Sequence, residues 1–148
     1  MTIQFIKATE TDAEKFVEVQ NKAFYLDYVK YGSCPGYGRT AQSLAESMKR
    51  NVAFKIVADG EIVGKISATK NERCNCHLDC LCVIPEYENR GIGQQAVAFI
   101  EKQFPDAVKW SLETPSDKLQ NHIFYEKCGY KSTAKTMEGN VEITIFEK

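Results

Sequence analysis

The segment LDCLCVIPEYENRGIGQQAVAF, Leu78–Phe99, carries the strongest signal in this sequence. An apolar run ends at Ile84, a polar stretch follows, and Gly91-Ile92-Gly93 leads into a run with helical periodicity. Two glycines at the start of a helix leave no side chains between a ligand and the backbone N–H groups. The helix dipole adds about half a positive charge at the same end. The pattern predicts a phosphate-binding loop between a strand and a helix.

The same segment resembles the acyl-CoA-binding motif of the GNAT superfamily of N-acetyltransferases, in which a strand and Pro-Glu-Tyr precede Gln/Arg-x-x-Gly-x-Gly/Ala and a long helix. Glu88 stands where that family normally has Gln or Arg. The resemblance implies acetyl-CoA as co-substrate, with the backbone of Leu81, Cys82 and Val83 pairing with its pantetheine amides. It also implies that the pyrophosphate is wrapped by a run of loop residues, namely Asn89, Arg90, Gly91, Ile92, Gly93 and Gln94.

A second segment, NHIFYEKCGY at Asn121–Tyr130, resembles the family's Phe-Tyr-Glu-Lys-x-Gly-Phe/Tyr sequence. The resemblance implies that Tyr125 protonates the leaving thiolate. The family's usual Asn lies seven residues before this tyrosine, where this chain has Lys118, so Asn121 is the remaining cofactor-binding candidate. Glu113 stands where several relatives have the carboxylate that deprotonates the acceptor amine. Asp79 and His122 are weaker candidates for the base, and water is a further one.

The glycines, proline and tyrosines of the stretch Tyr25–Thr40 are typical of an ordered loop. The resemblance implies that the acceptor site is built from residues Tyr28–Tyr37 of this loop. An aromatic and acidic pocket for a cationic amine is predicted from four of its residues, Asp27, Tyr28, Tyr31 and Tyr37. The alternative is that these aromatic side chains only pack over the sheet. The acceptor itself stays open between a small molecule and a peptide amine.

Periodicity along the chain predicts a single domain, residues 1–148, of the α/β (α+β) class, with a GNAT-like mixed, mostly antiparallel central sheet flanked by helices. Helices are expected from Thr11, at Ala41–Arg50, at Gly91–Gln103 and at Lys118–Lys127, the last capped by Gly129. Strands are expected at Ile3–Ala8, Val52–Ala58, Ile62–Ala68, Leu78–Ile84, Val108–Leu112, Tyr130–Met137 and Val141–Phe146. Asp59-Gly60 predicts a tight hairpin turn.

The composition narrows the possible partners. With a formal net charge of −1 and a pI near 6.1, the chain has no basic excess that would favour nucleic acid or an anionic membrane. No charged leader precedes an apolar run, and no stretch approaches the roughly 20 apolar residues of a membrane span. We therefore expect a cytoplasmic protein. The sequence does not determine its oligomeric state, but the C-terminal hairpin offers an edge strand through which a homodimer could form.

Three alternatives to an acetyltransferase remain open from the sequence. Gly91–Ala96 also fits the Gly-x-Gly-x-x-Gly/Ala dinucleotide fingerprint, although a dinucleotide loop would follow its strand directly. A non-catalytic acyl-CoA-binding module would keep the loop and lose the chemistry. Four cysteines within nine residues invite a zinc-stabilised interaction domain, but their Cys-x-Cys-x3-Cys-x-Cys spacing departs from common zinc sites, and no metal ligand is predicted among Cys74, Cys76, Cys80 and Cys82.

Overall fold

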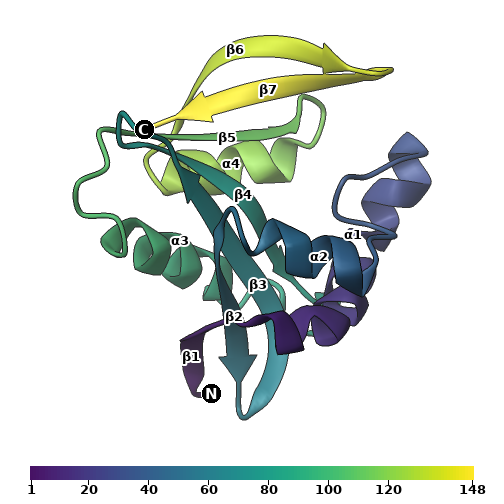
Figure 1. Cartoon of the computed structure of the whole chain (residues 1–148). Helices are drawn as coiled ribbons and strands as arrows, with labels where there is room; N and C mark the ends of the chain where they lie inside the picture. Colours follow the sequence, from purple (N-terminus) through teal and green to yellow (C-terminus); the bar gives the residue numbers. More distant parts are fainter.

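The computed structural model describes residues 1–148. The chain forms seven strands and four α-helices (Figure 1). In order they are β1 (Ile3–Lys7), α1 (Ala13–Tyr31), α2 (Ala41–Ser47), β2 (Val52–Ala58), β3 (Glu61–Lys70), β4 (Asn75–Val83), α3 (Ile92–Lys102), β5 (Lys109–Pro115), α4 (Leu119–Lys127), β6 (Lys131–Glu138) and β7 (Val141–Glu147). Apart from the end of α1, these bounds differ from the predicted ones by at most three residues.

All seven strands form one sheet in the order β1-β2-β3-β4-β5-β7-β6. Every neighbouring pair is antiparallel except β4 and β5, which are parallel. The β2–β3 hairpin closes through Asp59 and Gly60, both at positive φ (49° and 87°), as a tight turn between right-twisted strands requires. The predicted fold class, a mixed and mostly antiparallel sheet flanked by helices, is confirmed.

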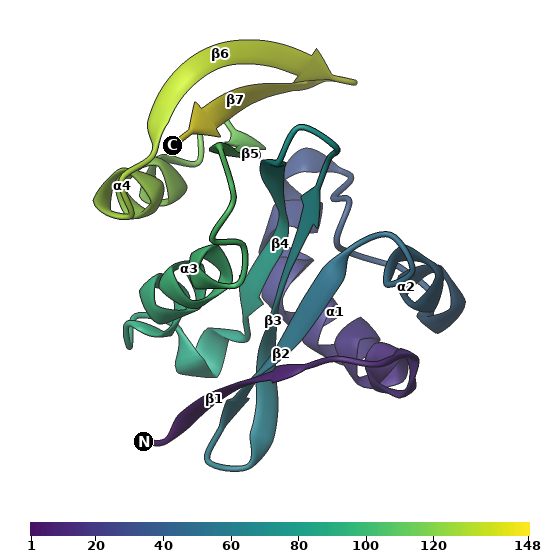
Figure 2. The same ribbon diagram turned by 60° about the vertical axis from the view of Figure 1, so that its left-hand side comes forward.

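The helices cover the two faces of the sheet (Figure 2): α1 and α2 lie on one face, and α3 packs on the other. The α3 face of the sheet carries the main aromatic packing, in which Phe99 stacks on Phe5 with ring centroids 4.8 Å apart and meets the edge of Phe54 at 4.9 Å. Ile66 and Ile100 are fully buried in the same core. This apolar contact fixes α3, and with it the loop before α3, against β4.

The pairing of β4 with β5 is short, and this positions the candidate site. It joins only Asn75, Cys76 and His77 to the facing residues of β5. Beyond this point β5 continues to Pro115 paired with β7 alone, and β4 continues to Val83 paired with β3 alone. The two strands therefore diverge in the middle of the sheet and leave an unpaired edge on β4.

One expectation is wrong: the loop predicted to start at Tyr25 starts only at Gly32, because the preceding residues are helical. Helix α1 continues to Tyr31 and ends where Gly32 adopts a left-handed conformation (φ 76°) and donates its N–H to the Tyr28 carbonyl at 2.9 Å. The apolar pattern stops at Phe24 because the last turns of α1 pack little apolar surface, with Leu26 74% exposed. Helix α1 contains no proline or glycine that would end it before Gly32, so the helix continues to Tyr31.

A bulge in β4 separates the cysteines that are close in sequence. Ser67 of β3 faces Cys80, whereas its neighbour Ala68 faces Leu78, so Asp79 is an extra residue in β4. Side chains alternate along a strand, and one inserted residue reverses which face they occupy. Cys80 and Cys82 therefore lie on the α1 face, and Cys76 lies on the α3 face. No three His, Cys, Asp or Glu side chains in the structure lie together in a way that could hold a metal ion.

No helix is both long enough and apolar enough to cross a membrane.

Candidate active site

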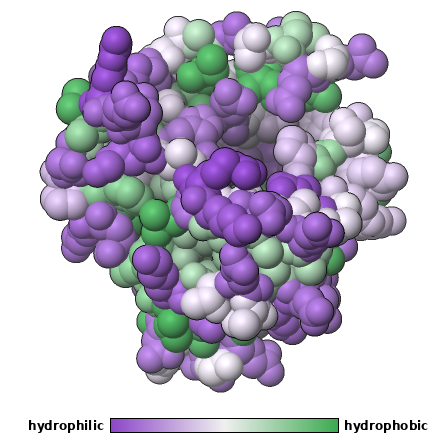
Figure 3. Space-filling model, viewed as in Figure 1, coloured by the Kyte–Doolittle hydropathy of each residue, from purple (hydrophilic) through white to green (hydrophobic).

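A cleft of about 1250 Å³ occupies the space where β4 and β5 diverge. Its walls come from the end of β4 and the loop after it, from β5 and α4, and from α1 with the segment that follows it. The space-filling view shows the molecule hollowed near the middle of this face, with mostly hydrophilic side chains around the opening (Figure 3). Most of the predicted site residues line this cleft, so the fold brings together segments that are distant in sequence.

The loop before α3 presents free backbone N–H groups. From Asn89 to Gln94 no N–H has a hydrogen-bond partner in the protein, and the first intrahelical bond is donated by Gln95 to the Gly91 carbonyl at 3.2 Å. Asn89 and Gly91 both have positive φ (60° and 79°), which turns successive N–H groups toward one side. Such a concave run of donors at a helix N-terminus suits a phosphate group. The left-handed conformation of Asn89 was not predicted.

The two glycines of this loop have different roles. A β-carbon on Gly91 would meet nothing within 4 Å, so its glycine is required by the backbone conformation alone. A β-carbon on Gly93 would lie 3.0 Å from the Phe124 ring, so this glycine lets α3 approach α4 closely. Arg90 stacks its guanidinium 5.1 Å from the centre of the Tyr87 ring and has no carboxylate partner. Arg90 does not line the cleft, so the loop suits a diphosphate through its backbone N–H groups.

The unpaired edge of β4 adjoins this loop. Leu81, Cys82 and Val83 all line the cleft, and no strand pairs with them on the β5 side. An extended ligand can add to such an edge as another strand would. The cleft therefore offers one continuous path, from the anion-binding loop along β4 toward the point of divergence.

Tyr125 of α4 lies in the same cleft, among the rings of Phe124, Tyr130 and Phe146 at centroid distances of 5.0, 6.0 and 6.3 Å. Burial raises the pKa of its phenol well above the usual value, and the nearby Cys80 and Cys128 thiols raise it further. The hydroxyl makes no hydrogen bond to the protein. A protonated, unpartnered hydroxyl at this position is available to a group in the cleft.

Two carboxylates line the cleft near the divergence. Glu113 of β5 is exposed and forms no ion pair or hydrogen bond through its side chain. Asp79, in the β4 bulge, accepts a hydrogen bond from the Thr69 hydroxyl, and burial raises its pKa. Both carboxylates therefore belong to the cleft wall, and of the two only Glu113 is free of hydrogen-bond partners.

The remaining α4 candidates have structural contacts. Asn121 lines the cleft and donates from Nδ2 to the Thr114 hydroxyl at 3.0 Å, so its amide oxygen stays free for a ligand. His122 approaches the Pro115 carbonyl at 3.3 Å and packs its ring edge-on against Phe146. His122 therefore ties α4 to the sheet and does not line the cleft.

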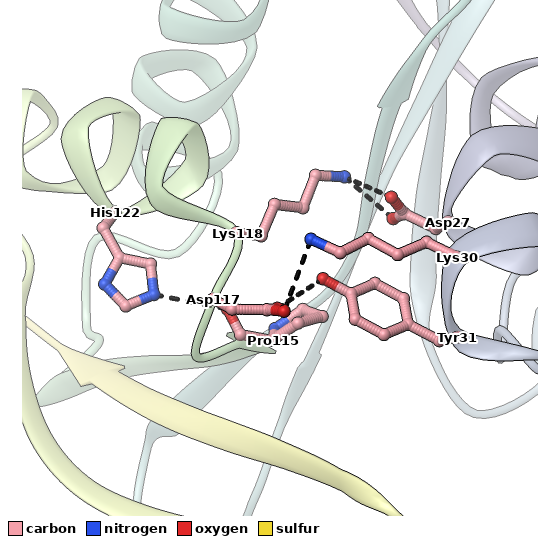
Figure 4. A network of polar contacts seen from close by, with 7 residues as sticks. All are labelled: Asp27, Lys30, Tyr31, Pro115, Asp117, Lys118 and His122. Atoms are coloured by element: carbon pink, nitrogen blue, oxygen red, sulfur yellow. Dashed lines mark hydrogen bonds and ion pairs between the residues drawn. The ribbon is translucent and has the colours of Figure 1, made fainter.

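The predicted acceptor residues lie on the last turns of α1 and in the segment after it. Asp27 already has a partner: Lys118 donates to its two oxygens at 2.9 and 2.8 Å (Figure 4). Beside this pair, the Tyr31 hydroxyl donates to Asp117 at 2.6 Å. These contacts bridge α1 to the segment between β5 and α4, across one end of the cleft. Tyr28 and Tyr37 stack on each other with centroids 4.3 Å apart, and neither lines the cleft.

Several cleft residues were not predicted from the sequence. Lys65 of β3 is buried and lines the cleft. Arg39 and Asn51, which are partly exposed, line it as well. Cys80 lies on the same wall, and its pKa is lowered by hydrogen bonding with the Cys82 thiol and by the positive charges of Lys65 and Arg39. The register of β3 against β4, which no local pattern reveals, places Lys65 opposite Cys82, two residues from Cys80 on the same face.

The chain belongs to the acetyltransferase (GNAT) family, whose family model matches residues 13–130. It is 34% identical over 129 residues to the uncharacterized protein YrkN of Bacillus subtilis (strain 168), a match that covers 83% of this chain and 70% of the relative.

Its fold is that of solved acetyltransferases. The PaiA N-acetyltransferase of Thermoplasma acidophilum, solved in complex with coenzyme A, has a TM-score of 0.84 at 20% identity, with 100% of this chain and 99% of that chain covered. The ribosomal-protein-S18-alanine N-acetyltransferase of Escherichia coli has a TM-score of 0.80 at 14% identity, with 99% and 92% covered. Acetyl transfer, in general terms, is therefore the activity of the family to which this chain belongs.

Proposed function

We propose that this protein transfers the acetyl group of acetyl-CoA to a primary amine, by direct attack within a ternary complex. The observation that carries the proposal is the continuity of one cleft. It begins at the free N–H groups of Asn89–Gln94, follows the open edge of β4, and ends between Tyr125 and Glu113. A ligand with a diphosphate at one end and an amide-containing arm fits this path.

Acetyl-CoA supplies an activated acetyl thioester in this scheme. The backbone N–H groups from Asn89 to Gln94 hold the diphosphate, and Arg90 adds a charged donor from the side. Leu81, Cys82 and Val83 align the pantetheine arm, and a backbone N–H near Val83 stabilises the negative charge that develops on the carbonyl oxygen. Asn121 contributes its free amide oxygen.

The proton transfers are assigned to two cleft residues. Glu113, or a water that it orients, removes the proton from the acceptor amine, since its carboxylate has no competing partner. Tyr125 donates its phenolic proton to the departing thiolate, and its raised pKa keeps that proton in place until it is needed. Asp79 is the second candidate for the base because burial raises its pKa. The amine reaches the thioester directly, so no covalent enzyme intermediate is part of the proposal.

The acceptor enters from the α1 side, where Asp27 and Tyr31 line the cleft and the stacked rings of Tyr28 and Tyr37 lie outside it. We further propose that residues 1–148 act as one domain and that the protein is cytoplasmic. Strand β6, which is exposed along its whole length at the edge of the sheet, is the surface that would form a homodimer.

The first test is calorimetric titration with acetyl-CoA, with NADH as the control ligand. Micromolar binding of acetyl-CoA with no response to NADH supports the proposed cleft, and CoA release is then measured against a panel of amines. The Glu113→Gln and Asp79→Asn variants decide which carboxylate is the base. Binding of acetyl-CoA without transfer to any amine would instead favour a non-catalytic acyl-CoA-binding module. No detectable binding of acetyl-CoA would refute the proposal.

A further inference from the structure

Lys65 is a buried cation without a carboxylate partner. It lies on β3, is only 3% exposed, and takes part in none of the ion pairs of the structure. Its Nζ donates to Gln20 Oε1 at 3.0 Å and lies 5.0 Å from the centre of the Phe16 ring. Lys65 and Gln20 both line the cleft, on its α1 side.

Such a group is costly unless something compensates its charge. An ammonium has three N–H donors, and a neutral amide satisfies only one of them here. Burial of a charge with no opposite charge beside it destabilises the folded protein. Gln20 is itself held in place, since its Nε2 donates to the Gly36 carbonyl at 3.0 Å. The fold therefore orients Lys65 and leaves its remaining donors free.

The surrounding charges favour an anion in this part of the cleft. Arg39 lines the same cleft, and its charge acts with that of Lys65 on the thiol of Cys80. Arg39 uses Nε and one terminal nitrogen on Ser43, at 2.9 and 3.2 Å, and has no acidic partner. The acid on the α1 wall, Asp27, is already neutralised by Lys118. Neither cation forms an ion pair, although the charge of Lys65 also acts on Asp79, the carboxylate of the β4 bulge.

A second unsatisfied atom lines the cleft. Asn51 Oδ1 is buried and has no hydrogen-bond partner, and Asn51 contributes to the cleft wall. A buried acceptor without a donor costs about 1–3 kcal/mol. This wall of the cleft therefore holds two polar side chains, Lys65 and Asn51, whose hydrogen-bonding capacity the protein does not fill.

We propose that Lys65, assisted by Arg39, binds an anionic group of the acceptor, so that the acetylated amine belongs to a molecule carrying a carboxylate or a phosphate. The inference rests on the proposed acetyl transfer and narrows its acceptor. Amino acids and amino phosphates fit this description. Polyamines and uncharged amines lack the group that Lys65 would bind.

The inference is tested with matched pairs of amines on the full-length protein. In each pair a neutral group replaces the anion: β-alanine and β-alaninamide, glycine and glycinamide, O-phosphoethanolamine and ethanolamine. Values of kcat/KM are referred to the free-amine form, because a nearby anion also raises the pKa of the amine. In acetyl-transfer assays we expect at least one anionic member to be preferred about tenfold or more in kcat/KM. Lys65→Met should abolish that preference, mainly through KM, and Lys65→Arg should retain part of it. The carboxylate and phosphate pairs identify which anion is bound.

Lys55 offers a matched control because it faces Lys65 across the β2–β3 pair. Unlike Lys65, it has a carboxylate partner, Asp12, at 3.0 Å. Lys55→Met should therefore lower stability in urea and leave the acceptor preference unchanged. Lys65→Met should be as stable as the wild type or more stable, because it removes a buried unpaired charge. A large loss of stability in Lys65→Met, with the preference intact, would assign Lys65 a structural role and overturn the inference.

Failure of the inference is distinguishable from failure of the proposed function. Equal transfer to both members of every pair would overturn the inference while acetyl transfer stands. If no amine is acetylated, the same pairs are titrated by calorimetry into protein saturated with coenzyme A, where no transfer can occur. Tighter binding of an anionic member, lost in Lys65→Met, supports the anion site. Equal binding, or no binding of any anionic member, overturns it.

Discussion

Tyr125 and Tyr130 offer a sharp test of the proposed chemistry, because their hydroxyl groups have opposite surroundings. Their rings lie 6.0 Å apart. The Tyr125 hydroxyl faces the cleft without a partner in the protein, whereas the Tyr130 hydroxyl donates to Glu101 at 2.8 Å. Phenylalanine at either position keeps the ring packing and removes a single oxygen. The two substitutions therefore separate a loss of chemistry from a loss of stability.

For Tyr125→Phe we expect a fall in kcat of about 10²- to 10⁴-fold, the usual range for loss of a general acid. Stability should be unchanged or slightly higher, since no hydrogen bond is lost. For Tyr130→Phe we expect normal kcat and a stability loss of about 1.5–3 kcal/mol, because the lost bond has a charged acceptor. In a domain of this size that loss lowers Tm by roughly 3–12 °C.

Transfer is best followed by the loss of thioester absorbance, because the six free cysteines of the protein would react with a thiol reagent. Thermal unfolding of the same preparations supplies the stability values. A Tyr125→Phe variant that keeps kcat within about threefold of the wild type refutes the acid role. A Tyr130→Phe variant that loses activity as strongly, at unchanged Tm, would show that the two hydroxyls are wrongly assigned.

Three further predictions address the loop, an ion pair and the pH dependence of stability. Gly91→Ala should cost about 1–2 kcal/mol, since its φ of 79° is unfavourable for any β-carbon, and should weaken acetyl-CoA binding in calorimetry; unaltered affinity would argue against the loop as the diphosphate site. Lys118→Met and Asp27→Asn, combined in a double-mutant cycle by urea unfolding, should show a coupling of about 0.5–3 kcal/mol, whereas strict additivity would contradict the pair. The pKa of Asp12 is lowered from 3.8 although burial alone would raise it, because the Thr9 N–H and the Lys55 ammonium stabilise its charged form. The contribution of the Asp12 carboxylate to folding stability is therefore present above about pH 4 and is lost as the pH falls through the lowered pKa. Asp12→Asn should lower the free energy of unfolding at pH 7 and do so progressively less in acid. A stability difference that does not change with pH would disprove the assignment.

Local signals were sufficient where the backbone itself decides the structure. The Asp59-Gly60 turn and the Gly129 helix end are both at positive φ, as we predicted from residue type. The order of the helices and strands was also predicted correctly, because hydrophobic periodicity indicates which side of each element will be buried. The end of α1 was missed for a related reason: its last turns extend past the apolar contacts, so the periodic pattern stops before the helix does.

The sequence was thus sufficient to identify the family and to suggest the path that we propose for acetyl-CoA, since both rest on a short contiguous motif. Only the tertiary structure decided what the cleft presents to an acceptor. The extra residue at Asp79 sets which cysteines face the cleft, strand register buries Lys65 without a carboxylate, and Lys118 neutralises Asp27 from 91 residues away in sequence. These features depend on contacts between segments that are distant in sequence, and the free energy of such contacts cannot be worked out from a local stretch of sequence.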